Sequence, residues 1–184
     1  MKTSNVISAT NELAATSREP SDSSRVIWPA DAHPDVCPVY SFNEIDTPAP
    51  PERVWAWLVR AERWPEFYGN AKNVKIPDGA NEIKDGVLFS WTTFGVRANT
   101  TVVEYVPERR LTWTGKGLGA TAYHGWVITP RGTGSHIVTE ETQRGGIASL
   151  GRVFLRSGLH KWHQRWLEGL ARMAEAGWPE GKKP

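Results

Sequence analysis

Residues 122–142, AYHGWVITPRGTGSHIVTEET, decide the fold because they predict a β-hairpin with one buried face. Apolar and polar side chains alternate along the stretch, as in strands that are covered on one side. The glycines of RGTG supply the turn between the two strands. In the first strand, large apolar residues mark the interior side, which consists of Ala122, His124, Trp126 and Ile128. The hairpin therefore directs a histidine into an apolar interior.

The turn also predicts which residues of the two strands face each other. If Ile128 lies opposite Ile137, then His124 lies opposite Glu141 on the same face. Opposed residues on one face have Cβ atoms about 5 Å apart, so we expect a hydrogen bond between them, direct or through one water. His124 and Glu141 are the candidate catalytic residues, with His124 as a general acid or base or as a donor to a ligand carbonyl. A structural pair without a chemical role is the alternative, because buried polar groups are normally paired.

Turn signals divide the chain before the hairpin into strand-length runs. These runs are VYSFNEI at 39–45, VLFSWTTF at 87–94, VRANTTVVEYV at 96–106 and RLTWTG at 110–115. Short turns between the consecutive later strands indicate an antiparallel meander. Two short helices are expected after the first strand, at PERVWAWLV (51–59) and RWPEFYG (63–69).

The last third of the chain, residues 147–176, predicts one long amphipathic helix. Its apolar residues recur at spacings of three and four, namely Leu159, Trp162, Trp166, Leu170 and Met173. Charged residues such as Lys161 and Arg165 fall on the opposite face. The pattern predicts an α+β domain in which a curved antiparallel β-sheet packs against this helix.

Length and composition limit the class of protein. The 184 residues suffice for one domain with a core, and 39% hydrophobic residues is typical of soluble globular proteins. A formal net charge of +2 gives no concentrated basic surface, so neither nucleic acid nor stable membrane insertion is expected. The single cysteine, Cys37, and an N-terminal sequence without the apolar run of a signal peptide indicate a cytoplasmic protein.

Composition also predicts how the chain is divided. Residues 1–38 are rich in Ser, Thr, Asn, Asp and Pro and predict a flexible or loosely docked arm, in which residues 26–28 are a possible docking point. Residues 39–176 form the domain, and residues 177–184 form a tail.

The order of elements resembles the START-like, or SRPBCC, superfamily, and within it the polyketide cyclase/dehydrase and lipid-transport type. The resemblance is carried by NEIDTPAPPERVWAWLVRAERWPEFYGNAKNVKI, VVEYVPERRLTWTG, the hairpin and WLEGLARMAEA, and it covers about three quarters of the chain. It implies a helix-grip fold, in which the sheet wraps around the long C-terminal helix and encloses an apolar cavity. Ligands and chemistries differ between members, so the resemblance implies a pocket for a small hydrophobic molecule and no shared catalytic signature.

Strand parity points a set of bulky side chains toward the apolar face of the long helix. The expected ligand-binding residues are Phe89, Trp91, Thr93, Leu111, Trp113, Trp126 and Thr139 in the sheet and Leu159, Trp162 and Trp166 in the helix. A single helix is too narrow to fill a strongly curved sheet, so bulky side chains or a ligand must occupy the remaining space. Since polar residues share these faces with the tryptophans, we favour a partly open aromatic cavity over a solid core.

Two other motifs do not predict a metal site or a phosphate site. His160 and His163 stand three residues apart on the long helix, but His163 only flanks the apolar stripe, and no carboxylate or cysteine is expected beside it. Neither a metal nor another cofactor is therefore predicted. The glycine run TGKGLG at 114–119 lacks the spacing and the following helix of a phosphate-binding loop.

Three classes of function remain open. The first is a carrier or binding protein for an apolar or aromatic molecule, lipid-like or polyketide-like. The second, implied by the resemblance, is a cyclase or dehydratase that uses His124 to move protons. The third, also implied by it, is a protein-partner module such as an assembly factor or chaperone activator, which needs an exposed apolar patch. Tyr40, Phe42 and Tyr123 on the outer sheet face are the candidate patch, unless the arm covers them. We expect a monomer or a homodimer.

Overall fold

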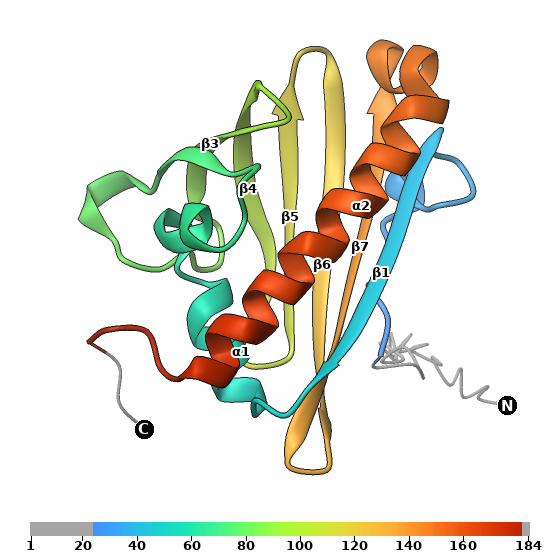
Figure 1. Ribbon diagram of the computed structural model, residues 1–184. Helices are drawn as coiled ribbons and strands as arrows, with labels where there is room; N and C mark the ends of the chain where they lie inside the picture. Colours follow the sequence, from blue (N-terminus) through green and yellow to red (C-terminus); the bar gives the residue numbers. More distant parts are fainter. Residues whose placement is uncertain (1–23, 182–184) are drawn as a thin grey trace, which may run out of the picture.

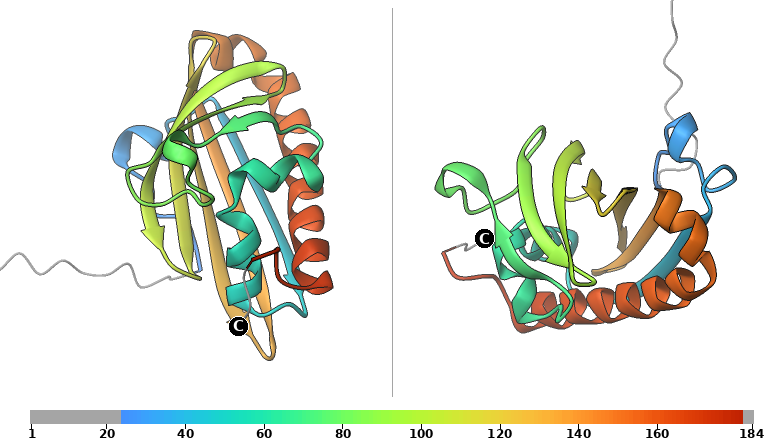
Figure 2. Two further views of the ribbon diagram at one scale, coloured as in Figure 1. Left: turned by 90° about the vertical axis from the view of Figure 1, so that its left-hand side faces the viewer. Right: turned by 90° about the horizontal axis from the view of Figure 1, so that it is seen from above.

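The computed structural model describes residues 24–181, which form one seven-stranded antiparallel sheet and a long helix. The strands lie in the order β1-β7-β6-β5-β4-β3-β2, and helix α2 runs diagonally across the concave face of the sheet (Figure 1). Viewed from above, α2 extends along the open side of the curved sheet (Figure 2). This arrangement is the helix-grip architecture that the sequence predicts.

The elements follow the predicted order. The strands are β1 (Val39–Thr47), β2 (Lys72–Lys75), β3 (Leu88–Thr93), β4 (Val96–Val106), β5 (Arg110–Gly117), β6 (Ala120–Arg131) and β7 (Gly134–Gly145). The α-helices are α1 (Pro51–Leu58) and α2 (Gly146–Ala176), and the 3-10 helices are η1 (Ala30–Ala32), η2 (Ala61–Glu66) and η3 (Pro77–Gly79). The two short helices expected after the first strand are α1 and η2. Strand β2 was not predicted, because KNVK carries no apolar alternation and its lysines suit an exposed sheet edge.

The predicted register of the hairpin is confirmed. In the β6–β7 ladder, Ile128 pairs with Ile137, and His124 pairs with Glu141. Both of the latter residues are buried on the concave face of the sheet. Alternation of apolar and polar side chains sets this register, since a slip of one residue would turn the apolar side of each strand toward solvent.

Strand β1 forms the edge of the sheet next to β7 and contacts α2. Asn43 of β1 is buried, and its side-chain amide donates to the carbonyl of His160 and to Oε1 of Gln164, both at 3.1 Å. These two acceptors lie one turn apart on α2. The contacts orient the helix so that its apolar face meets the sheet.

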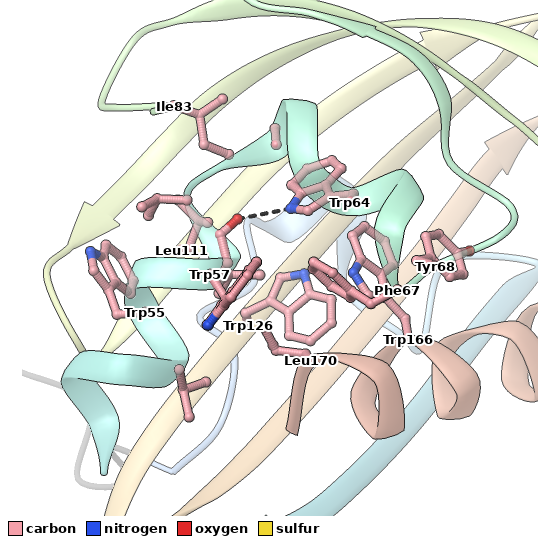
Figure 3. Packing of buried hydrophobic residues seen from close by; sticks show 14 of the residues in the cluster. Trp55, Trp57, Trp64, Phe67, Tyr68, Ile83, Leu111, Trp126, Trp166 and Leu170 are labelled. Carbon is pink, nitrogen blue, oxygen red and sulfur yellow. Dashed lines mark hydrogen bonds between the residues drawn. The ribbon is translucent and has the colours of Figure 1, made fainter. Parts of the chain in front are cut away.

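Aromatic rings form the centre of the core (Figure 3). Trp166 of α2 stacks on Tyr68 with ring centroids 4.2 Å apart, and it meets Trp64 at 4.9 Å and Trp126 at 5.0 Å. The indole N–H of Trp64 donates to the carbonyl of Leu58 at 2.9 Å, which fixes η2 against α1. This end of the concave face is a solid core.

The described part of the arm, residues 24–38, lies against the sheet face opposite α2 (Figure 2). Val26 is buried there over Gly125, where a Cβ atom would lie only 2.6 Å from the Val26 side chain. The ring of Trp28 covers Tyr123, with centroids 5.4 Å apart, and Phe42 packs in the same cluster. The outer apolar patch is therefore covered by the arm, which was one of the two expectations for it.

A buried charge also fixes the arm. Arg25 forms an ion pair with Glu140 at 2.6 Å, and the Glu140 side chain is 0% exposed. The hydroxyl of Tyr40 and the backbone N–H of Val26 donate to the same carboxylate. The rest of the predicted arm, residues 1–23, lies outside the described residues, as do residues 182–184 of the tail. Within residues 24–181, no helix is long and apolar enough to cross a membrane.

Candidate functional site

A cavity of about 160 Å³ lies between the concave face of the sheet and α2. It sits beside the aromatic core, toward the β3–β4 and β5–β6 turns. Its walls come from β3 to β7, from α2 and from Tyr68. Most lining side chains are apolar, and three of them are the indoles of Trp91, Trp113 and Trp166. The cavity can therefore hold an apolar or aromatic group.

Small residues create this space. One row across the sheet consists of Thr100, Gly115, Ala122 and Gln143, which are neighbours in the β4–β5–β6–β7 ladders. The next row, toward the aromatic core, consists of Val102, Trp113, His124 and Glu141. The cavity opens where the inward-facing residues change from large to small, because short side chains leave room between the sheet and α2.

His124 and Glu141 form the predicted pair. Nδ1 of His124 lies 3.0 Å from Oε2 of Glu141, and the His124 side chain is only 1% exposed. Nε2 lies 2.7 Å from Oγ1 of Thr139, whose hydroxyl also lies 3.2 Å from the carbonyl of Gly125. The indoles of Trp113 and Trp126 enclose the imidazole, with centroids at 4.8 and 5.5 Å. The pair thus lies in an apolar environment.

A second histidine joins the pair from the helix. Nε2 of His163 lies 3.3 Å from the same Oε2 of Glu141, and the two imidazoles stack with centroids 4.6 Å apart. The side-chain amide of Gln143 donates to Oε1 at 2.6 Å. The sequence led us to expect no carboxylate beside His163, and this expectation is wrong, because α2 docks with that residue directly over β7.

Near neutral pH, Glu141 carries a buried negative charge beside a neutral His124. Burial lowers the pKa of His124 to about 4, although the nearby Glu141 opposes this effect, so the imidazole is neutral. Burial would raise the pKa of Glu141, but the attraction and hydrogen bonds of the two histidines outweigh it, so the net shift is downward. Among the described residues, Glu141 forms an ion pair with no lysine or arginine. The two histidines and Gln143 therefore supply the polar contacts of this carboxylate.

The structure brings about half of the predicted site residues to the cavity. The lining includes Trp91, Thr93, Trp113, Glu141, Leu159 and Trp166. Phe89, Leu111 and Trp126 belong to the solid core, and the partly buried Trp162 packs against it. Thr139 and His124 do not line the cavity either; they lie in sheet rows on its side toward the aromatic core. Parity identified the inward face correctly, but the cavity occupies only one end of that face.

Sequence reasoning missed two kinds of lining residue. The small ones are Ala98, Gly115, Ala120 and Ala122, and the turn residues are Phe94 and Leu118, which lie at the ends of the β3–β4 and β5–β6 hairpins. Phe94 and Leu118 are 42% and 66% exposed, so they stand where the cavity meets solvent. An apolar residue followed by glycine in a tight turn is the signal that marks them.

Comparison with known proteins agrees with this geometry. Residues 43–175 match the family model described as polyketide cyclase / dehydrase and lipid transport, which covers well over half of the chain. No curated protein matches the sequence significantly.

Solved structures share the fold at low sequence identity. A hypothetical protein, jhp0584 from Helicobacter pylori, has a TM-score of 0.75 and 23% identity over 92% of this chain and 99% of its own. The di-domain aromatase/cyclase StfQ from the steffimycin biosynthetic pathway has a TM-score of 0.64 and 16% identity, over 75% of this chain and 51% of its own. Ara h 8.0201 has a TM-score of 0.60 and 15% identity, over 75% and 98%. At these identities the likeness concerns the fold alone.

Proposed function

Because the chain belongs to the polyketide cyclase/dehydrase and lipid-transport family, we propose that it binds an apolar or aromatic small molecule in the cavity between the sheet and α2. The cavity lining carries this proposal. Three indoles offer flat apolar surfaces, while Glu141, Gln143 and His163 supply polar groups at one side. Apolar walls with a few converging polar groups are typical of small-molecule sites.

The size of the cavity narrows the class of ligand. About 160 Å³ is less than the roughly 300–1,000 Å³ of common ligand sites, and it is close to the roughly 150 Å³ of an engineered cavity that binds benzene. The proposed ligand is therefore a single aromatic ring, or the ring at one end of a longer molecule. A larger lipid-like or polyketide-like ligand would have to extend past Phe94 and Leu118 at the mouth.

Binding of small aromatic molecules to the full-length protein tests the proposal. Indole, 1-naphthol and decanoic acid would be titrated by calorimetry, and the thermal midpoint would be recorded with each compound. We expect a heat of binding and a raised midpoint with indole or 1-naphthol, because Trp91, Trp113 and Trp166 line the cavity. If no compound of this panel changes either signal, the binding proposal is wrong.

A cyclase or dehydratase is the second candidate, and it is favoured by the carboxylate and imidazole on the lining. Glu141 and His163 face the cavity, whereas His124 touches it only through Glu141. The predicted acid–base role of His124 therefore requires that it act by positioning Glu141 and setting its proton affinity. An enzyme with the substitution His124→Asn should keep its affinity for 1-naphthol and lose turnover of a polyketide-like substrate. A carrier should show no turnover in either form.

A further inference from the structure

The contacts of Thr139 limit where protons can lie around His124. A threonine hydroxyl has one hydrogen, so its two contacts are both hydrogen bonds only if it donates to the carbonyl of Gly125 and accepts from Nε2–H of His124. A neutral imidazole with its proton on Nε2 has a bare lone pair on Nδ1. That lone pair points at Oε2 of Glu141 from 3.0 Å. In this tautomer a bound cation would take the place of the proton that, in the other tautomer, Nδ1 of His124 donates to Oε2 of Glu141.

We propose that Nδ1 of His124, Oε2 of Glu141 and Nε2 of His163 bind a first-row divalent transition-metal ion such as Zn²⁺. These three atoms all lie within 4.8 Å of one another, and each residue that carries them is buried. Two imidazole nitrogens and one carboxylate oxygen are donors that Zn²⁺ prefers, and three protein ligands leave a coordination position open. The proposal does not depend on the nature of the molecule in the cavity.

The surroundings of the three residues suit a metal site. Histidines that bind metals donate their other ring N–H to a fixed acceptor, and Oγ1 of Thr139, 2.7 Å from Nε2 of His124, is placed to accept such a bond. Gln143 holds the second oxygen of Glu141, which leaves Oε2 for the ion. By contrast, Nδ1 of His163 is buried and has no hydrogen-bond partner among the described residues, so packing orients this ligand. A divalent ion would also offset the buried negative charge of Glu141.

The cavity gives an ion a route to the site. Glu141 and His163 both belong to the lining, and the lining reaches solvent at Phe94 and Leu118. The open coordination position would therefore face the proposed ligand. A bound ion would bring a Lewis acid to the polar side of an otherwise apolar pocket.

The test is metal binding by the full-length protein after it has been stripped with EDTA. We expect equimolar uptake of Co²⁺ with visible ligand-field absorption, displacement of Co²⁺ by Zn²⁺, and a higher thermal midpoint with equimolar Zn²⁺. Glu141→Gln and His163→Asn should each weaken Co²⁺ binding by about 100-fold or more, since even outer-shell changes weaken it by about 10–100-fold. Thr139→Val, which keeps the buried shape, should weaken it by about tenfold.

Two histidines outside the cluster provide matched controls. His160 lies one turn before His163 on α2, and the ring nitrogens of His136 lie 3.3 Å from the carboxylate of Glu44 and 2.8 Å from that of Asp46. His160→Asn and His136→Asn should bind Co²⁺ as the parent does. The proposal is overturned if the parent takes up no equimolar metal, or if Glu141→Gln and His163→Asn bind Co²⁺ as tightly as the parent and the two controls. Binding of 1-naphthol to the EDTA-treated protein is measured separately, so failure of the metal site and failure of the ligand cavity give different results.

Discussion

Filling the cavity should stabilise the protein and weaken ligand binding at the same time. Ala122 lies in the middle of the small row on β6, next to Gly115 on β5 and Gln143 on β7. Its methyl group faces the cavity, and it remains partly exposed there. In the variant Ala122→Leu, a larger apolar side chain would occupy space that a ligand would otherwise use.

The size of both effects follows from the added carbon atoms. Burial of a methylene group contributes roughly 0.8 kcal/mol, so the three carbons that leucine adds give at most about 2.4 kcal/mol. Because the walls are not shaped for this side chain, we expect a gain of about 1 kcal/mol in the free energy of unfolding, or about 2–4 °C in the midpoint. Ligand affinity should fall by about tenfold or more, as expected when a methyl-sized group enters a hydrophobic pocket.

Urea unfolding and calorimetric titration with 1-naphthol measure the two quantities on the same protein. Thr129→Leu is the matched control, because Thr129 lies on the same strand but points to the opposite face, away from the cavity. It should leave affinity unchanged. If Ala122→Leu lowers stability and leaves affinity intact, the space beside Ala122 is not a ligand cavity, and the reasoning from the small row is refuted.

Three further predictions concern the core and the arm. Trp166→Ala should lower the free energy of unfolding by about 3–5 kcal/mol, and Trp166→Phe by less than half of that, because the buried indole N–H has no acceptor within the described part of the chain; urea unfolding measures both. Arg25→Ala should destabilise by about 1–2 kcal/mol in the same assay, less than the roughly 3–5 kcal/mol of a fully buried pair, because the Arg25 side chain is 49% exposed while Glu140 is buried. Burial and the hydrogen bond to Glu140 raise the pKa of Tyr40 to about 12 from its ordinary 10, so the folded protein keeps a proton that the unfolded chain loses. Stability should therefore fall as pH rises from 10 to about 12, and Tyr40→Phe should remove this part of the decline.

Local rules were sufficient for the sheet apart from β2, and for the His124–Glu141 pair of the polar cluster. Parity and the RGTG turn predicted that His124 faces Glu141, because in a hairpin the turn fixes the register and the register fixes every opposed pair. The same rules placed Trp91 and Trp113 on the concave face. These contacts need only information from neighbouring strands.

The contribution of the helix could not be predicted in this way. The helical period shows that His163 flanks the apolar stripe, but which strand it meets depends on the angle and rotation with which α2 crosses the sheet. That geometry is fixed by distant contacts such as Asn43 with Gln164, which no local pattern contains. The expectation that no carboxylate lies beside His163 failed for this reason, since Glu141 approaches it to 3.3 Å.

The position of the cavity was harder to predict from the sequence than its aromatic walls, because the cavity arises where side chains are short. Large side chains draw attention to a face, yet Phe89, Leu111 and Trp126 pack into solid core. The cavity lies instead over Gly115 and Ala122, which contribute little to the alternation of large apolar and polar residues along a strand. A cavity is better predicted from small inward-facing residues that lie side by side on adjacent strands. Here the small residues lie next to the buried carboxylate of Glu141, so the cavity combines free space with a polar group, as small-molecule sites do.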